Sequence, residues 1–222
     1  MGRLRNRERE VKNSLNAIAR FLFGLRRPSR ATNTRLLHQR GETRQSLVIR
    51  EATPDDIPAL AELHVKTWSD TYWNVISQPT YQIRERQWRE QFKKIDERWF
   101  CLVVENHHGE LVGFAKGQSY ASDDLPGYSG ELNKIYLLRQ YQRLGLGRRL
   151  VGHVARRFLD QGISTMVLFG TPQNPSCAFH EALGGERLFA SNGEFHGGYG
   201  WRDLHKLASS CPIEPSQDEP AA

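Results

Sequence analysis

The sequence predicts a mixed α/β domain in which helices pack against one central sheet. Short β-rich runs alternate with amphipathic helical patterns along most of the chain. Antiparallel hairpins and strand-helix-strand crossovers are both expected, which requires a sheet that contains parallel and antiparallel pairs. We expect about six to seven strands, mostly antiparallel, flanked by about four helices.

Charge and composition divide the chain into three parts. Residues 1–45 hold eleven arginines and one lysine against three glutamates, whereas the remainder carries nineteen basic and twenty-two acidic residues. This composition predicts a basic tail that is mostly disordered, especially over Arg26–Gln45. We place the folded domain at residues 46–208 and a second disordered tail, rich in proline, at residues 209–222.

Within the basic tail, apolar residues recur at three- and four-residue steps over about Arg9–Leu25. The spacing allows a basic amphipathic helix that lies on an anionic membrane or docks on a partner, and a solvated extension explains it equally well. We expect at most a weak contact with an anionic surface and no specific nucleic acid partner. No apolar run of signal length follows the positive end, and no segment reaches membrane length.

The three cysteines indicate a reducing compartment. Cys101, Cys177 and Cys211 cannot all pair within one chain, and they do not have metal-ligand spacing. The cytoplasm is therefore the expected location. His107 and His108 lie in an Asn-His-His-Gly stretch, which is typical of a hairpin turn rather than of a ligand pair. We accordingly expect no metal ion.

The folded domain is expected to begin with a strand and two helices. Leu47–Glu51 is the strand. Thr53 and Asp56 then form a capping box around Pro54, which starts the first helix. A second helical stretch covers about residues 72–94.

The later elements alternate between strands and helices. A hairpin with its turn at Asn106–Gly109 comes first, and a loop at Ser122–Tyr128 separates it from an apolar run at Leu132–Leu138. The expected helices are 147–161 and 174–183, and the expected strands are 99–105, 110–119, 132–138, 165–169, 186–190 and 199–204.

A glycine turn joins the run at 132–138 to the helix that follows. The first amides of a helix have no carbonyl partner, and together with the positive end of the helix dipole they favour an anion. Glycine also lets a phosphate approach without a Cβ in the way. The diphosphate of a cofactor suits this turn, which consists of Gln142, Arg143, Leu144, Gly145, Leu146 and Gly147, with further positive charge from Arg139, Arg148 and Arg149.

Three phosphate-binding motifs compete for this turn. A P-loop needs Gly-Lys-Ser/Thr, but arginine follows Gly147. A dinucleotide fingerprint needs a third glycine where Leu150 stands. The remaining pattern is Gln-x-x-Gly-x-Gly, and in it the stretch Gln142–Gly147 resembles the turn of the GNAT N-acetyltransferase superfamily.

The resemblance extends over about Leu47–Leu207 and rests on four separated stretches in the expected order. It implies the GNAT fold, with the fourth and fifth strands splayed apart and acetyl-CoA in the gap. It also implies transfer of the acetyl group to a primary amine of a small molecule or a protein N-terminus, by direct attack in a ternary complex. The four stretches are His64–Tyr72, Glu131–Gln142, Asn174–Gly185 and Tyr199–Leu204.

The resemblance implies where acetyl-CoA binds. The backbone of Leu137 and Arg139 would pair with pantetheine like an added strand, although relatives commonly have proline at the position of Arg139. Asn174 would contact the cofactor, and a role as helix N-cap explains it equally well. The implied cofactor-binding residues are Leu137, Arg139, Gln142, Arg143, Leu144, Gly145, Leu146, Gly147, Arg148 and Asn174.

Two residues are candidates for the proton transfers. The amine must lose a proton before it attacks, and Glu131 is the candidate base, with a solvated glutamate at a strand start as the alternative. Many relatives have a tyrosine that protonates the departing thiolate, and His180 stands at that position here. A histidine can donate a proton near neutral pH, and packing beside Phe179 is the alternative.

The acceptor pocket is expected between the connection at 68–76, the strand at 114–120 and the last hairpin, with Trp68, Tyr72 and Tyr120 as walls. We expect a monomer or a homodimer. Two other classes of function remain open. One is a GNAT-fold protein that binds an acyl-CoA or a partner without catalysis, and the other is a binder of nucleic acid or anionic membrane that acts through the tail.

Overall fold

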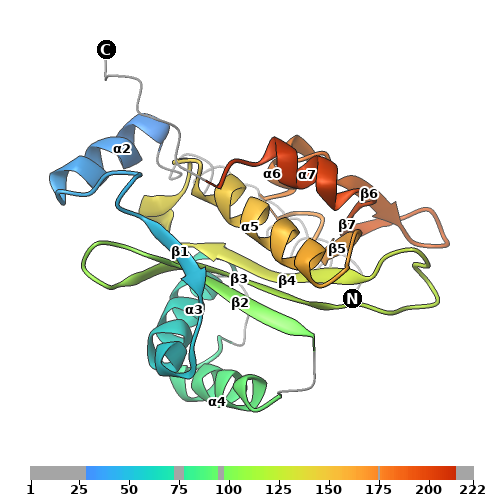
Figure 1. Ribbon diagram of the computed structural model, residues 1–222, viewed down its shortest axis with the longest axis horizontal. Coiled ribbons are helices and arrows are strands. Elements are labelled where there is room, and N and C mark those ends of the chain that lie inside the picture. Colours follow the sequence, from blue (N-terminus) through green and yellow to red (C-terminus); the bar gives the residue numbers. More distant parts are fainter. Residues whose placement is uncertain (1–28, 73–77, 95–97, 175, 214–222) are drawn as a thin grey trace, which may run out of the picture.

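The computed structural model describes residues 29–72, 78–94, 98–174 and 176–213 (Figure 1). Their seven strands are β1 (Val48–Glu51), β2 (Trp99–Glu105), β3 (Leu111–Ser119), β4 (Gly130–Leu137), β5 (Met166–Phe169), β6 (Glu186–Phe189) and β7 (Phe195–Trp201). They form one sheet in the order β1-β2-β3-β4-β5-β7-β6. The β4–β5 pair is parallel and the others are antiparallel, which confirms the predicted mixed sheet.

The described residues also form six α-helices, two more than expected. They are α2 (Arg30–Gln39), α3 (Ile57–Thr71), α4 (Tyr81–Phe92), α5 (Leu146–Asp160), α6 (Cys177–Ala182) and α7 (Leu204–Ser210). Helix α7 corrects the strand expected at 199–204. Strand β7 ends at Trp201 because Asp203 starts this helix, where its carboxylate accepts from the amide of Lys206 at 3.0 Å.

The helices cover both faces of the sheet. Figure 1 shows α3 and α4 on one face and α5 with α7 on the other. On the first face, the ring of His64 lies 5.3 Å from that of Phe114 and 6.0 Å from that of Trp88. On the opposite face, the rings of Phe100 and Phe158 lie 5.0 Å apart. Burial of these apolar groups is the main stabilising contribution to the fold.

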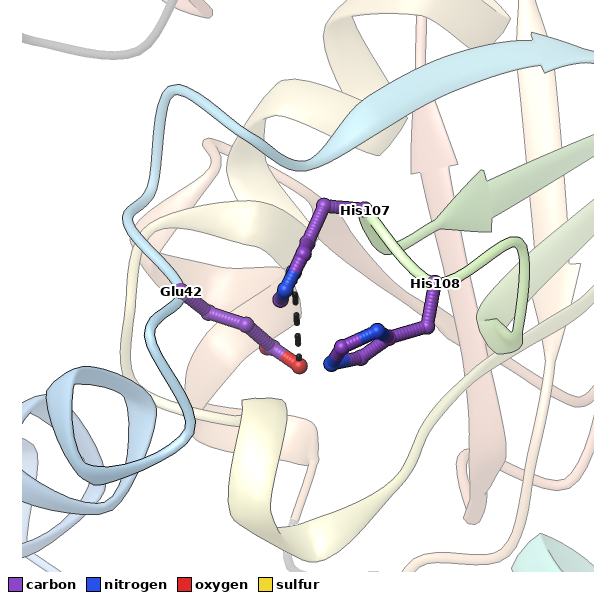
Figure 2. A group of neighbouring side chains, drawn as sticks. All are labelled: Glu42, His107 and His108. Atoms are coloured by element: carbon purple, nitrogen blue, oxygen red, sulfur yellow. Dashed lines mark ion pairs between the residues drawn. The ribbon is translucent and has the colours of Figure 1, made fainter.

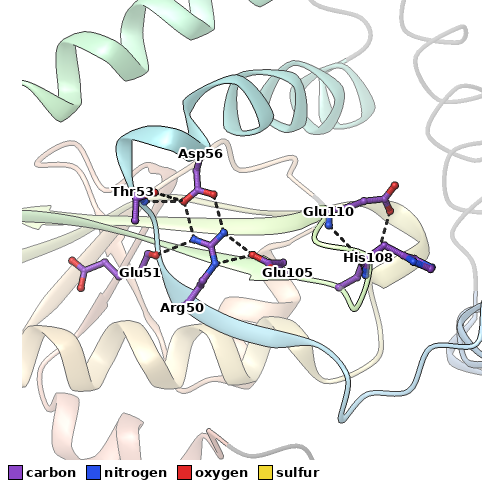
Figure 3. Close-up of polar contacts among 8 residues, drawn as sticks. Arg50, Glu51, Thr53, Asp56, Glu105, His108 and Glu110 are labelled. Atoms are coloured by element: carbon purple, nitrogen blue, oxygen red, sulfur yellow. Dashed lines mark hydrogen bonds and ion pairs between the residues drawn. The ribbon is translucent and has the colours of Figure 1, made fainter.

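The predicted capping box before α3 is confirmed. The amide of Thr53 donates to the Oδ2 atom of Asp56 at 2.8 Å, and Arg50 holds both Asp56 and Glu105 (Figure 3). The second helix starts later than expected, at Tyr81, where the hydroxyl of Thr80 caps it by accepting from the amide of Ile83 at 3.3 Å. Of the residues between the two helices, 73–77 lie outside the described ranges.

We expected disorder over Arg26–Gln45, and this expectation is wrong for the described residues from 29 onward, because they contain the helix α2. Leu37 is 1% exposed and Asn33 is fully buried, so α2 packs on the domain through two anchor residues. The hydroxyl of Ser29 caps the helix by accepting from the amide of Thr32. The amphipathic helix expected at 9–25 lies outside the described residues.

The folded domain also continues past residue 208, where the C-terminal tail was expected to begin. Helix α7 ends at Ser210, Cys211 is buried, and the carbonyl of Ile213 accepts from Arg149 at 3.1 Å. All three cysteines are free thiols. In the described ranges, no helix has the length and apolar character needed to cross a membrane.

Two irregularities of β4 shape the site. Its pairing with β3 shifts at Asn133, so that Lys134 faces Lys116 while Leu132 faces Gly117. Its ladder with β5 consists of only two pairs, which involve Gly130 and Glu131. The two strands therefore separate beyond Glu131, as the predicted splay requires.

Candidate active site

A cavity of about 550 Å³ lies between the end of β4, the start of α5 and helix α6. Its wall combines most of the predicted cofactor residues with the C-terminal turn of α3. The predicted residues that line it are Leu137, Arg139, Gln142, Arg143, Gly145, Gly147, Arg148, Asn174 and His180. Sequence reasoning missed Thr67, Asp70, Thr71, Ser176 and Phe179, which also line it.

The start of α5 presents unbonded amides to this cavity. The first amide of α5 with a backbone partner belongs to Arg149, which donates to the carbonyl of Gly145 at 3.1 Å. The N–H groups of Leu146, Gly147 and Arg148 precede it and carry the positive end of the helix dipole. Free amides of this kind favour an anion, which is the physical basis of the predicted diphosphate site.

The two glycines of the turn have different physical roles. Gly145 has a φ angle of 84°, a left-handed conformation that favours glycine, and it is the N-cap of α5. A Cβ at Gly147 would instead lie 3.2 Å from the ring of Phe179. Gly147 thus also allows α6 to pack closely on α5, a role that the sequence pattern did not indicate.

Side chains from two distant segments hold the turn in place. The amide nitrogen of Asn33 in α2 donates to the carbonyls of Arg139 and Gln142, at 2.9 and 2.7 Å. The side chain of Gln142 donates to the carbonyl of Leu137 at 2.9 Å. Nothing in the sequence pattern singled out Asn33, because its partners lie more than a hundred residues away in the chain.

The predicted cations of the turn separate into two groups. Arg139 donates to the carbonyl of Asp70 at 2.8 Å, and Arg149 is 8% exposed and bonded to the carbonyls of Leu47 and Ile213. These two arginines therefore have structural partners. Arg143 and Arg148 are exposed and line the cavity, and Arg148 also donates to the carbonyl of Ser210 at 2.9 Å. The side chains of Leu144 and Leu146 are buried in the core.

His180 packs in the wall of the cavity rather than in solvent. It is 3% exposed, its ring lies 5.4 Å from that of Tyr199, and its Nε2 atom lies 3.2 Å from the hydroxyl of Ser176. Burial lowers the pKa of His180 to about 4. The imidazole is therefore neutral at pH 7, which weakens the expected role as an acid that titrates near neutrality.

A second cavity of about 60 Å³ shares Asn174, His180 and Tyr136 with the first. Tyr72 also lines it, and its hydroxyl oxygen accepts from the side chain of Asn174 at 3.3 Å. The helix expected from residue 174 begins instead at Cys177, since Asn174 forms the turn that precedes it.

Glu131 lies at the last β4–β5 pair, where the strands begin to separate. Its two carboxylate oxygens accept from the side-chain amides of Gln118 at 2.7 Å and Asn133 at 2.9 Å. Gln118 accepts in turn from Lys116, and Asn133 accepts from Lys134. Glu131 does not line either cavity.

The two lysines behind Glu131 were not predicted. Lys116 is 7% exposed, and burial lowers its pKa to about 8. Burial and, to a smaller extent, the charge of Arg84 lower the pKa of Lys134. The alternation of side chains along β3 and β4 could have indicated that both lysines lie on the same face of the sheet. The bulge at Asn133 interrupts this alternation in β4 and hides the signal.

The predicted acceptor walls are only partly brought together. Trp68 stacks on Tyr72 with ring centroids 4.5 Å apart, and the guanidinium of Arg84 lies 4.8 Å from the ring of Trp68. Tyr120 packs instead on Phe169 and lines neither cavity. Arg84 is 9% exposed, and its Nε atom has no hydrogen-bond partner among the described residues.

Two curated bacterial proteins are similar to most of the chain. The uncharacterized N-acetyltransferase YuaI of Bacillus subtilis is 34% identical over 172 residues, which cover 72% of this chain and 96% of the relative. Phosphinothricin N-acetyltransferase of Streptomyces viridochromogenes is 28% identical over 180 residues, or 78% of this chain and 96% of that protein.

Solved structures support the same fold. The PaiA N-acetyltransferase of Thermoplasma acidophilum in complex with coenzyme A matches with a TM-score of 0.57, at 20% identity, over 70% of this chain and 98% of that one. YncA of Salmonella typhimurium with its cofactor acetyl-CoA matches with a TM-score of 0.51, at 22% identity, over 72% of this chain and 94% of that one. The model of the acetyltransferase (GNAT) family matches residues 58–185. The chain therefore belongs to the GNAT family of N-acetyltransferases, for which acetyl-CoA is the acetyl donor.

Proposed function

We propose that the cavity of about 550 Å³ binds acetyl-CoA. The observation that carries this proposal is that one cavity is lined both by the end of β4, where it has separated from β5, and by the start of α5, whose first amides have no backbone partner. The diphosphate would lie at the amides of Leu146, Gly147 and Arg148, with added charge from Arg143. Pantetheine would run along Leu137 toward the point where the strands separate.

We propose that a primary amine of a small molecule attacks the acetyl group directly in a ternary complex. The amine nitrogen forms a bond to the thioester carbonyl carbon, and the C–S bond then breaks. Glu131 takes the amine proton through a water molecule, since it lies at the point of strand separation and both of its oxygens have only neutral amide donors.

The departing thiolate needs a proton, and we propose Tyr72 as its source in place of His180. The Tyr72 oxygen accepts from Asn174, which leaves its own proton available for donation. Tyr72 and His180 line the same small cavity, but His180 is neutral at pH 7 because of its lowered pKa. His180 then acts as a packing residue beside Phe179.

We further propose that the acceptor carries an anionic group near its amine. Lys134 lines the small cavity, Arg84 lies 4.8 Å from the ring of Trp68, and the charge of Arg84 acts on Lys134. The unpartnered Nε atom of Arg84 supports this proposal, because a buried donor requires an acceptor. The Streptomyces relative is named a phosphinothricin N-acetyltransferase.

The location and the partners remain proposals. The three free cysteines support a reducing cytoplasm. The weak surface contact expected of the basic tail rests on residues that lie mostly outside the described ranges, and we retain the prediction of a monomer or a homodimer.

Acetyl-CoA binding can be measured by calorimetry on the native chain, Gly145→Glu and Gly145→Ala. Both variants place a Cβ at a φ angle of 84°, so they share the same backbone strain. Only the glutamate adds a negative charge at the proposed diphosphate site. We expect Gly145→Glu to lose at least tenfold more affinity than Gly145→Ala. Equal losses in the two variants would contradict this assignment of the turn.

The acceptor proposal is tested by a panel of primary amines with and without a carboxylate or phosphinate. Thiol release should be faster by about tenfold or more with the anionic amines, as expected for one charge-assisted hydrogen bond. A native chain that binds acetyl-CoA but acetylates uncharged amines equally well would overturn the role given to Arg84 and Lys134.

A further inference from the structure

The turn between β2 and β3 brings two histidines to a buried carboxylate, away from the acetyl-CoA cavity. Figure 2 shows the side chains of Glu42, His107 and His108 pointing toward one another. Each offers one ligand atom, and these atoms all lie within 4.8 Å of one another. The Nδ1 atom of His107 is 3.9 Å from the Oε1 atom of Glu42.

Glu42 is only partly satisfied by its protein neighbours. It is 1% exposed, and its Oε1 atom accepts from the hydroxyl of Tyr141 at 3.0 Å and the side-chain amide of Asn106 at 3.2 Å. Its Oε2 atom is buried and has no hydrogen-bond partner among the described residues. A buried carboxylate with an orphaned oxygen is costly unless a cation accompanies it.

The turn is held in shape by bonds that do not involve the histidine rings. The Oδ1 atom of Asn106 accepts from the amides of His108 and Glu110, at 3.0 and 2.9 Å. The same side chain donates to Glu42, which joins the turn to the segment after α2. The rings of His107 and His108 lie 3.7 Å apart, so the turn presents both toward Glu42.

We propose that Glu42, His107 and His108 bind a Zn²⁺ ion, with the fourth position open to water. Imidazole nitrogen and carboxylate oxygen are both zinc ligands, and in a tetrahedral site neighbouring ligand atoms lie about 3.3 Å apart. The observed separations of at most 4.8 Å exceed this by up to about 1.5 Å, and the histidines are exposed enough for their rings to rotate inward. The sequence predicted a hairpin turn at Asn106–Gly109, and the backbone confirms it. It did not predict that the two histidine side chains lie near Glu42.

The ion would clamp three separate segments together. Glu42 follows α2, the histidines lie between β2 and β3, and Tyr141 ends the short 3-10 helix η2 (Arg139–Tyr141). Zinc would therefore stabilise the packing of the N-terminal segment on the domain. This stabilisation does not depend on the assignment of the acetyl-CoA cavity.

The proposal is tested by titrating Zn²⁺ into the full chain, free of metal and of any polyhistidine tag, in a calorimeter. We expect one ion per chain at micromolar affinity or tighter. The double variant His107→Ala/His108→Ala should bind at least tenfold more weakly, because its turn keeps Asn106 and loses both rings. The control His196→Ala/His205→Ala removes two exposed histidines from β7 and α7, outside this cluster, and should bind as the native chain does.

A second readout separates this site from adventitious binding. Co²⁺ in the same place should produce the visible absorption of tetrahedral coordination, absent from the double variant, and Zn²⁺ should raise the thermal midpoint of the native chain alone. A double variant with native affinity, or a native chain without zinc binding, would overturn the proposal. The histidine variants keep the test valid even where Glu42→Gln fails to fold.

Discussion

The two sides of β4 differ in how they are built. The cavity beside α5 depends on backbone amides and a left-handed glycine turn, and its histidine is neutral. The side that faces α3 and α4 depends on charged side chains, with Glu131 between two amide-linked lysines and Arg84 nearby. A binding site made of backbone amides does not change when side chains are substituted, so it suits a ligand that stays the same. A binding site made of side chains changes with each substitution, so it can differ between substrates. We therefore expect substitutions on the two sides to separate binding from chemistry.

The largest effect is expected for Glu131→Gln, which removes the proposed base and keeps the shape of the side chain. The maximal rate of thiol release should fall by about 10²–10⁴-fold, the usual contribution of general base catalysis. Acetyl-CoA affinity should stay unchanged, as measured by calorimetry. The control Glu90→Gln, on the exposed face of α4, should retain full activity. Near-native turnover in Glu131→Gln would contradict the assignment of the proton transfer to the side of β4 that faces α3 and α4.

The next effect concerns the neutral His180 in the cavity wall. Its pKa is about 4 in the folded chain and about 6.5 when unfolded, so the unfolded state binds more protons between these values. Its contribution to stability is thus present above pH 6.5 and is lost as the pH falls toward 4. The full difference is about 3 kcal/mol.

Urea unfolding of the native chain and His180→Gln at pH 7 and pH 5 measures this contribution. The variant should lose less stability on acidification than the native chain. His64 acts in the same direction in both proteins, because burial lowers its pKa to about 2. An equal loss in the two proteins would show that His180 is not buried in its neutral form.

A smaller effect is expected for Arg84→Gln on the acceptor side. It should raise the KM for anionic amines by about tenfold, the value of one charge-assisted hydrogen bond. The KM for acetyl-CoA should not change. Steady-state kinetics with each substrate varied in turn provides the measurement. A matched rise for uncharged amines would indicate that Arg84 only packs on Trp68.

The smallest effect on ligand binding is expected for Asn33→Ala in α2. The variant removes the two hydrogen bonds that hold the carbonyls of Arg139 and Gln142. Stability should fall by about 1–3 kcal/mol, because both acceptors lose a donor. Acetyl-CoA affinity should weaken only a few-fold, as calorimetry can show. Unchanged affinity together with reduced stability would limit Asn33 to a role in folding.

The order of strands, the glycine turn and the family resemblance could be predicted because each depends on neighbours in the chain. The pattern Gln142–Gly147, the capping box at Thr53 and the apolar strands are local signals. The same local reasoning failed at α2, where composition predicted disorder. Buried residues, among them Asn33 and Glu42, order that segment, and their hydrogen-bond partners lie far away in sequence.

By itself, the sequence determined the mixed sheet, the glycine turn and the family, since hydrophobic period and turn chemistry act over a few residues. Only the tertiary structure decided which charged side chains have protein partners and which can contact a ligand. It tied Arg139 to Asp70, buried His180 in a neutral state and gathered Glu42 with His107 and His108. The physical reason is that burial and long-range partners set the charge and orientation of a side chain, and neither is encoded by its neighbours in the chain.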